Sequence, residues 1–424
     1  MKNSSQASVL IVVMVLCFGL VAITLLFGYR MMIARRAADN NLAAQQAEQA
    51  LEGGARYGVY LMTNVARPGA MPDANTLESG SLEVGDATFW FIGVPQGRDF
   101  SGEPTFGIVD EASKLNINTA SVEMLMGLPG MTSELATNIV AWRSAATGTD
   151  NAGVILSSSN AKFAPFETPE ELILLTGTDT TLLYGRDLNL NHVLDPVESE
   201  SDSRNEAFGL LEYVTVFSRE PNVQSDGATP RVLVTGSTPA LTALLTNAFG
   251  ARRAGELIRR AQTSGTVNSV LGFYIRSGMT EPEFEEVAPR LTAATGSSIA
   301  GLVNANTASA TVLACLPGID PDNAAALVAA RGQTSTQPAT LAWVVPILGE
   351  ENALLAGPYL TADSYQWSVD VAAVGRHGRG YRRALFILDN LSGTPRILYR
   401  RNLSHLGWAL GDTVRESLLS QKND

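Results

Sequence analysis

The sequence predicts an α+β fold in which one long N-terminal helix starts in a membrane and then packs on an antiparallel sheet. Three observations predict it. Residues 8–62 read as one helix, apolar at first and amphipathic later; alternating strands stand near both ends of the remaining chain; and a helix-rich segment with an internal repeat lies between them. The helical segment is therefore expected to be an insertion into the sheet domain.

The long helix is predicted by its apolar pattern. Residues 8–29 are almost continuously apolar, and at helical rise they span roughly 33 Å, about the hydrocarbon core of a bilayer. A narrow apolar stripe then recurs at three- and four-residue steps: Ala34, Ala37, Ala44, Ala47, Leu51, Ala55, Gly58 and Met62. Before Pro68 only Gly53-Gly54 could kink the helix. We expect one helix, its first half in lipid and its second half against a soluble domain, since the apolar run is too long for a cleaved secretory signal.

The charges around the span conflict with one simple topology rule. Lys2 and the amino terminus precede the span, while Arg30, Arg35 and Arg36 follow it. Positive charge usually stays on the cytoplasmic side, so this count favours a cytoplasmic body. A cytoplasm-facing scaffold is therefore one alternative.

Composition limits the function. The 424 residues suggest two or three domains, and the net charge of −12 argues against a phosphate-binding surface. Cys17 cannot pair with Cys315 if it lies in the bilayer. We find no nucleophile elbow, zinc-ligand spacing or phosphate loop, and the three histidines (His192, His377 and His405) lie far apart without evident partners. The sequence does not predict an enzyme.

The sheet is predicted from both ends of the soluble part. Residues 82–92, with a turn at Gly85-Asp86, and residues 106–109 are expected to be strands, as are residues 365–374, 381–389 and 396–399. The alternation in the last three predicts an antiparallel sheet with one wet face. Near them stand seven arginines: Arg376, Arg379, Arg382, Arg383, Arg396, Arg400 and Arg401. They could bind an acidic partner or anionic lipid headgroups, or simply be solvated and protect the sheet edge.

The helical segment contains an internal repeat. Asn116-Ile117-Asn118-Thr119-Ala120-Ser121 and Leu128-Pro129-Gly130 return 188 residues later as Asn304-Ala305-Asn306-Thr307-Ala308-Ser309 and Leu316-Pro317-Gly318. The copies span residues 114–143 and 302–331. In each, Thr119 or Thr307 is expected to cap a short helix, the proline and glycine end it, and a second helix follows. Between the copies a strand is expected at residues 210–217, and helices at roughly 238–292.

Each copy resembles the helix-hairpin-helix (SAM-like) unit that grips DNA phosphates. Such units commonly carry a second glycine two residues after the first, where this chain has Thr132 and Asp320. Aspartate repels phosphate, and the surroundings are not basic. Packing modules without nucleic acid are the favoured interpretation; a membrane-anchored helix-hairpin-helix DNA-binding protein of the competence type is the alternative.

Residues 187–198 have the spacing of a calcium loop. Oxygen-bearing side chains occupy positions one, three, five, nine and twelve, and the carbonyl of position seven adds another: Asp187, Asn189, Asn191, Asp195, Glu198 and Val193. His192 stands where glycine usually makes the sharp turn, and Pro196 suggests that no regular helix continues through the loop. Calcium is the expected cofactor; the alternative is a solvated acidic loop.

Together these features resemble the K-type minor pseudopilins of type II (general) secretion systems. The resemblance rests on the polar leader before Ser8, Asp110-Glu111, both Asn-x-Asn-Thr-Ala copies, Leu128-Pro129-Gly130-Met131, Trp142-Arg143 and Pro165-Phe166-Glu167, in this order. It implies a helical domain inserted into a pseudopilin core, and leader cleavage by the prepilin peptidase between Ala7 and Ser8. Val12 stands where major pseudopilins have a membrane-embedded glutamate, which a tip subunit would not need.

The same resemblance implies a non-enzymatic tip or initiation subunit of a pseudopilus that supports export across the outer membrane. It also implies a single-pass inner-membrane protein with its body in the periplasm, I- and J-type minor pseudopilins as partners, and exported proteins as further candidates. The expected segments are 1–7 leader, 8–29 transmembrane helix, 30–111 amphipathic helix and first strands, 112–350 helical domain, and 351–424 last strands.

Overall fold

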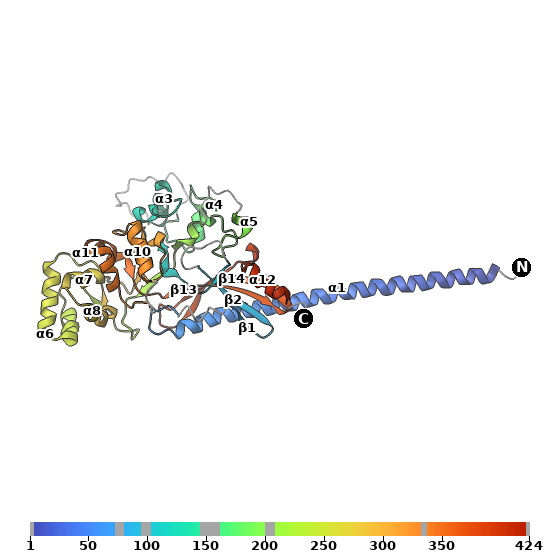
Figure 1. Ribbon diagram of the computed structural model, residues 1–424, viewed down its shortest axis with the longest axis horizontal. Coiled ribbons are helices and arrows are strands. Elements are labelled where there is room, and N and C mark those ends of the chain that lie inside the picture. Colours follow the sequence, from blue (N-terminus) through green and yellow to red (C-terminus); the bar gives the residue numbers. More distant parts are fainter. Residues whose placement is uncertain are drawn as a thin grey trace.

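A computed structural model of the chain describes residues 4–72, 80–94, 103–144, 162–199, 208–331 and 337–420. The first three leader residues, and the side chains of Ala7 and Ser8, lie outside this description. A single helix, α1 (Ser4–Thr63), projects as a rod from a body of one sheet and many short helices (Figure 1). The predicted α+β fold, with a long N-terminal helix on an antiparallel sheet, is confirmed.

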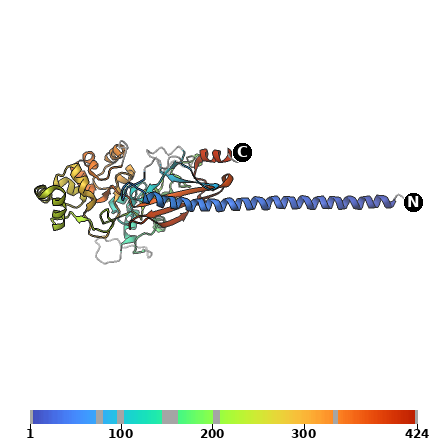
Figure 2. The same cartoon turned by 90° about the horizontal axis from the view of Figure 1, so that it is seen from below.

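The first half of helix α1 is exposed, and its second half packs against the body. From Leu10 to Ile33 its large apolar side chains are exposed, and no other part of the described structure covers them. From Ala43 onward one stripe is buried against the body (Figure 2). The helix continues through Gly53-Gly54, where a Cβ on Gly54 would lie only 2.6 Å from Val371 Cγ1. The small residues of the stripe therefore allow the helix to approach the sheet closely.

The sheet has seven strands, all paired antiparallel. Its main order is β1 (Leu82–Val84), β2 (Ala87–Gly93), β13 (Gln366–Gly375), β14 (Arg379–Asp389) and β15 (Arg396–Asn402). Two short strands join at the side: β3 (Thr105–Phe106) pairs with β2, and β4 (Val109–Asp110) pairs with β13. Strands from both ends of the soluble chain thus form one sheet, with the helical segment leaving and returning beside β13.

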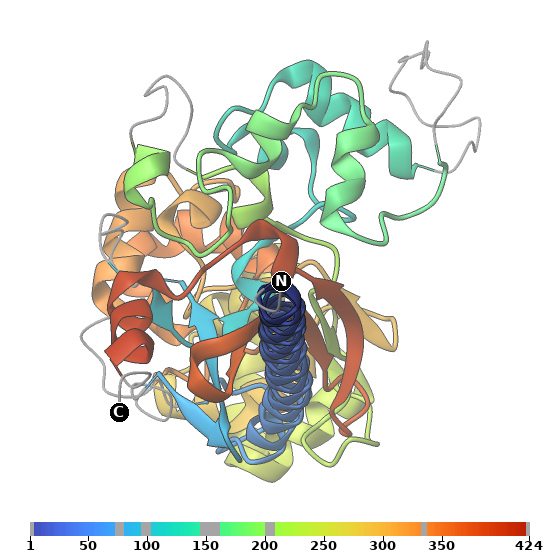
Figure 3. The same cartoon turned by 90° about the vertical axis from the view of Figure 1, so that its right-hand side faces the viewer.

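The expectation of one wet face is wrong for the central strand, because every residue of β13 is buried. One face carries Phe89, Phe91, Val369 and Val371 and packs on α1. The other face packs partly against a C-terminal helix that the sequence did not predict, α12 (Gly411–Ser420). The end-on view shows α1 running across the sheet (Figure 3).

The β13–β14 hairpin is attached tightly to α1. A Cβ on Gly380 would lie 2.5 Å from the backbone of Ala43, so only glycine allows this approach. Arg376 adds an ion pair to Asp39, with 2.8 Å between Nη2 and Oδ1. Farther along, Arg382 and Arg400 pair with Glu48, and Arg400 also with Glu52. These members of the arginine group therefore hold helix and sheet together.

The helical segment contains three modules, each closed by a two-residue parallel bridge. The bridging pairs are β5 (Leu115–Asn116) with β6 (Val214–Thr215), β8 (Val232–Leu233) with β9 (Leu291–Thr292), and β11 (Val303–Asn304) with β12 (Leu360–Thr361). A 3-10 helix precedes each closing strand: η4 (Leu210–Glu212), η5 (Ala288–Arg290) and η7 (Gly357–Tyr359). In each closing strand the threonine hydroxyl accepts a hydrogen bond from the backbone N–H two residues later.

The first and third modules contain the two copies of the repeat. Helices α2 (Val122–Met126) and α3 (Ser133–Arg143) form one hairpin, and α9 (Ala310–Leu313) and α10 (Pro321–Arg331) form the other. Their N-caps are Ser121 and Ser309, not the predicted Thr119 and Thr307. A Cβ on Gly127 would lie 2.9 Å from Sγ of Cys315, which is its counterpart 188 residues on. Equivalent positions of the copies therefore touch each other, as in an approximate two-fold arrangement.

The second module is a divergent copy that the sequence comparison missed. Thr238 caps its first helix six residues after the strand begins at Val232, the spacing that Ser121 and Ser309 also keep. Its helices are α6 (Pro239–Thr263), α7 (Val270–Ser277) and α8 (Glu281–Val287). Leu233 and Thr235 replace the two asparagines, so the side-chain signal of the repeat is lost while its backbone plan remains.

Three expected boundaries need correction. Residue 350 falls inside α11 (Val345–Ala356), so the helical segment runs on to β12. Residues 210–217 begin with a 3-10 helix over Leu210–Glu212, and only Val214 and Thr215 are in a strand. A short helix, α5 (Pro196–Ser199), does begin at Pro196, because proline fits the first position of a helix.

Candidate functional site

The loop at residues 187–198 lies between α4 (Thr180–Tyr184) and α5 and is folded back on itself. Leu190 and His192, at positions four and six, have φ values of +56° and +64°. His192 thus adopts the left-handed conformation that glycine usually supplies at position six. Calcium loops need such sharp turns to point alternate side chains toward one centre.

The predicted ligand side chains are drawn together inside this loop. Asp187 accepts hydrogen bonds from the backbone N–H groups of Asn191 and His192. Glu198 accepts from those of Leu188, Asn189 and Asp195, although it lies at the other end of the loop. The side chain of Asn189 donates to Asp195 (Nδ2 to Oδ2, 2.6 Å). Asp187, Asn189, Asn191 and Glu198 are buried.

The electrostatics of the loop suit a bound cation. Burial raises the pKa of Asp187 to about 6, against the opposing charge of His192, and burial also raises the pKa of Glu198. Asn191 is fully buried, yet its Nδ2 has no hydrogen-bond partner. In the described part of the chain no three His, Cys, Asp or Glu side chains lie close enough to hold a metal alone. A cation here would therefore depend on the amide oxygens and the Val193 carbonyl as well as the carboxylates.

A buried arginine attaches the loop to the sheet. Arg383 on β14 is completely buried and forms a two-point ion pair with Asp370 on β13 (Nε to Oδ1, 3.0 Å; Nη2 to Oδ2, 2.6 Å). The same guanidinium donates to the carbonyl oxygens of Asn189 and Leu190. The sheet thus holds the two carbonyls at positions three and four of the loop, a contact that the sequence did not indicate.

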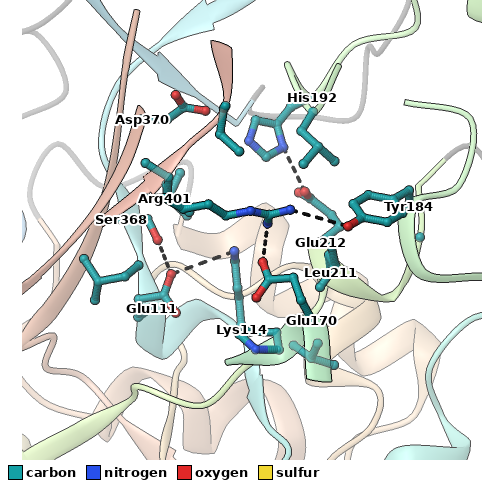
Figure 4. A pocket seen from close by; sticks show the side chains of 18 of the residues that line it. Glu111, Lys114, Glu170, Tyr184, His192, Leu211, Glu212, Ser368, Asp370 and Arg401 are labelled. Carbon is teal, nitrogen blue, oxygen red and sulfur yellow. Dashed lines mark hydrogen bonds and ion pairs between the residues drawn. The ribbon is translucent and has the colours of Figure 1, made fainter. Parts of the chain in front are cut away.

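A cavity of about 100 Å³ lies beside the loop, between the sheet and the first module (Figure 4). Aliphatic residues line much of it, and ion pairs surround the rest. His192, for which no partner was expected, pairs with Glu212 (Nδ1 to Oε2, 2.8 Å), and Arg401 contacts Glu170 and Tyr184. The Glu212 carboxylate raises the pKa of His192 despite burial. The charged groups named here thus already have partners across the cavity.

Asp110 and Glu111 join the sheet to the modules. Asp110 is buried and accepts four hydrogen bonds: Oδ1 from the Ala112 N–H and Ser364 Oγ, and Oδ2 from Asn304 Nδ2 and Thr307 Oγ1. Glu111 binds the hydroxyls of Thr215 and Ser368. The pair therefore ties β4 to the first and third modules and to the start of β13.

Asp110 is expected to make stability fall with rising pH. Burial raises its pKa from 3.8 to about 6, with its four hydrogen bonds opposing the shift. Between these values the folded chain keeps a proton that the unfolded chain has lost, so this contribution is present below about pH 4 and is lost as the pH rises through 6. The free energy of unfolding of the natural chain, relative to Asp110→Asn, should fall by up to about 3 kcal/mol between pH 4 and 7. Urea titrations of both chains in detergent measure this; parallel curves contradict it.

Each hairpin turn touches one neighbouring helix, although Gly130 is exposed and Gly318 is half-buried. A Cβ on Gly130 would lie 2.7 Å from Leu182 of α4, and a Cβ on Gly318 would lie 2.6 Å from the Asn352 carbonyl of α11. Thr132 and Asp320, in place of the second glycine, bond through their side chains to the first turn of the following helix. Thr132 and Asp320 thus act as helix caps at the positions where a phosphate-gripping unit commonly has its second glycine.

Comparison with known proteins adds two family matches. A helix-hairpin-helix motif model matches residues 110–152, and the model of type II secretion system protein K matches residues 303–339. No curated protein sequence matches the chain significantly. Among solved structures, the crystal structure of the GspK–GspI–GspJ complex from the enterotoxigenic Escherichia coli type 2 secretion system is similar at 9% identity and a TM-score of 0.35, covering 88% of this chain and 99% of that chain.

The family matches fall on the modules that contain the internal repeat. The first copy lies within the helix-hairpin-helix match, and nearly all of the second lies within the match to protein K. The chain thus resembles the K-type minor pseudopilins of type II secretion, as its sequence indicated.

Proposed function

We propose that this chain is a non-enzymatic minor pseudopilin that acts at the tip, or in the initiation, of a type II secretion pseudopilus. The observation that carries the proposal is the similarity of residues 303–339 to secretion protein K. The fold supports it: α1 has an apolar half long enough to cross a membrane and a second half packed on a sheet. The three helical modules make the body broad, which suits a subunit with nothing above it.

On this proposal the prepilin peptidase cleaves between Ala7 and Ser8, and α1 anchors the chain in the inner membrane with its body in the periplasm. The I- and J-type minor pseudopilins are the partners, and the assembly they form supports the export of proteins across the outer membrane. Helix α1 leaves a row of exposed side chains along the body, including Leu42 and Tyr60, at which a neighbouring helix can pack.

Co-purification tests this proposal. The full chain, tagged after Asp424 and extracted in detergent, should retain the I- and J-type subunits. Leu42→Arg with Tyr60→Arg should lose them, because two charges then face the neighbouring helix. Leu174→Arg is the matched control, since Leu174 is equally exposed but lies in η3 (Pro169–Leu174), away from α1. A reporter at the C-terminus that is active only in the cytoplasm, together with failed co-purification, contradicts the proposal.

DNA binding in the manner of competence proteins is the other candidate, favoured only by the helix-hairpin-helix match. The net charge of −12 opposes it, and so does the carboxylate of Asp320 at the second turn. A gel shift at low salt separates the two functions, since tight and salt-sensitive binding would support the DNA receptor.

We further propose that calcium binds the loop at residues 187–198 and stabilises the fold. Asp187, Asn189, Asn191, Asp195 and Glu198 would supply side-chain oxygens, and Val193 its carbonyl. Calcium at a hundred times its dissociation constant should stabilise the natural chain by about 2.7 kcal/mol, so a chelator should lower its melting temperature.

A variant pair checks the calcium prediction. Asp187→Asn with Glu198→Gln should abolish the calcium-dependent shift in melting temperature, because both carboxylate charges are lost. Asp179→Asn should keep the shift, since Asp179 is an exposed helix cap just outside the loop. Equal melting curves with calcium and with chelator for the natural chain rule the site out.

A further inference from the structure

We propose that the end of the body nearest the membrane binds anionic phospholipid headgroups of the bilayer that α1 crosses. The surface consists of Arg30, Arg35 and Arg36 on α1 and Arg379 at the β13–β14 hairpin; we term it the membrane-proximal basic cluster. The inference rests on the proposed membrane span, and goes beyond it by assigning a ligand class to one surface of the body.

The first argument is position along the helix. The exposed apolar side chains of α1 continue through Met31, Met32 and Ile33. Asp39, which binds the hairpin through Arg376, follows Tyr29, the last residue of the proposed span, by ten residues, or about 15 Å of helix. The headgroup layer is roughly 5–8 Å thick on each side of the hydrocarbon core. The hairpin tip is thus held about 7–10 Å above the headgroup layer.

The second argument is that the hairpin cannot move away from this level. Gly375 and Gly380 touch the backbone of Ala43 so closely that a Cβ at either would clash. The tip between them, η8 (Arg376–Gly378), also packs against Leu418 of α12. Figure 2 shows the C-terminal helix ending beside the point where α1 leaves the body. His377 at the tip is exposed, and so is Leu419 near the end of α12.

The third argument is the distribution of charge. Within the described residues, the arginines of the membrane-proximal basic cluster have no acidic side chain at ion-pair distance, and those on α1 are exposed. The acidic side chains at the membrane-proximal end of the body either form ion pairs or lie farther from the membrane than the cluster. Asp39 forms an ion pair with Arg376, and Glu48 forms ion pairs with Arg382 and Arg400. Asp86 accepts a hydrogen bond from Gln46, which lies farther along α1 from the membrane than Asp39. Of the two acidic residues of α12, Asp412 and Glu416, Glu416 lies two residues from Leu418, which contacts the tip.

An anionic headgroup complements this arrangement. Each arginine near an anionic surface gains attraction that decays within about 8–10 Å at moderate salt, which is the separation estimated above. The chain as a whole carries a net charge of −12, so its other surfaces are repelled by the same lipids. Arg30, Arg35 and Arg36 follow the span, where the positive-inside rule disfavours them if the body is in the periplasm. Binding to lipid headgroups gives these three arginines a role on the periplasmic side.

Depth-dependent quenching tests the inference on the full chain in lipid nanodiscs. A fluorophore is placed at His377→Cys in a Cys17→Ser background, where the remaining Cys315 is buried, and the quencher is carried on lipid headgroups. Quenching should be stronger in phosphatidylglycerol-containing discs than in phosphatidylcholine discs. The difference should disappear at about 0.5 M salt. A label at Gln262→Cys on α6, at the far end of the body, should show no lipid dependence.

Charge variants complete the test. Arg35→Gln, Arg36→Gln and Arg379→Gln together should abolish the difference between the discs, and the three lysine replacements should restore it. Arg252→Gln with Arg259→Gln, two exposed arginines of α6, should leave it intact. Quenching that is equal in both lipids for the natural chain overturns the inference. Extraction of the chain by alkaline carbonate would instead show that α1 does not span, and the proposed anchoring would then fail as well.

Discussion

Replacing Arg383 with methionine should lower the free energy of unfolding by about 3–5 kcal/mol, because it leaves a buried charge without its partner. Arg383 is fully buried, and Asp370, its partner, is also buried. The substitution also removes the donors to the carbonyls of Asn189 and Leu190. Urea denaturation of the full chain in detergent, followed by tryptophan fluorescence, measures the loss.

Two variants distinguish the lost charge pair from general damage to β14. Arg382→Ala, at the neighbouring position, should cost less than about 1 kcal/mol, since Arg382 is exposed and lies 3.7 Å from Glu48. Arg383→Met combined with Asp370→Leu should recover part of the loss, because no uncompensated carboxylate remains. A single variant as stable as the natural chain would show that the loop does not depend on this contact.

Asp110→Ala is expected to cost about 4 kcal/mol at pH 7, since four donors lose their acceptor and each buried donor left without one costs about 1 kcal/mol. The donors belong to three separate parts of the fold, so the loss should also loosen the third module from the sheet. Hydrogen exchange at β11 and β12 should rise more than exchange at β14. Denaturant titration of the natural chain and of Asp110→Ala gives the total loss in the free energy of unfolding.

The control is an aspartate of similar sequence context but different surroundings. Asp322→Ala, in the exposed first turn of α10, should change the stability by less than about 0.5 kcal/mol. Asn304→Ala, which removes one donor to Asp110, should give an intermediate loss. Equal losses for Asp110→Ala and Asp322→Ala would contradict the role of Asp110 as a junction.

The sequence predicted those structural features that depend on residues within a few helical turns or one strand of each other. Helix α1 has its apolar run, its stripe of small residues and no proline before Pro68, and each of these acts locally. The two hairpins were visible because Leu-Pro-Gly and the asparagine pairs recur. The loop at residues 187–198 has a spacing of oxygens that points to calcium, and occupancy there stays a prediction.

Contacts between distant residues could not be read in this way. Thr119 looked like a helix cap, but Ser121 takes that role because the backbone turns two residues later than expected. His192 seemed unpaired until the fold brought Glu212 beside it. The second module kept its backbone plan after its asparagines were lost, since two-residue bridges and a capping threonine need little sequence.

The amino-acid sequence by itself determined the anchor-like helix, the α+β class and the repeated hairpins, because these depend on the order and spacing of neighbouring residues. Only the tertiary structure decided that the central strand β13 is covered on both faces, that Arg383 holds the loop, and that most of the arginines pair with acids on α1 or elsewhere. The reason is physical: a charge or a strand face is exposed or buried according to what packs against it, and those partners stand up to hundreds of residues away along the chain.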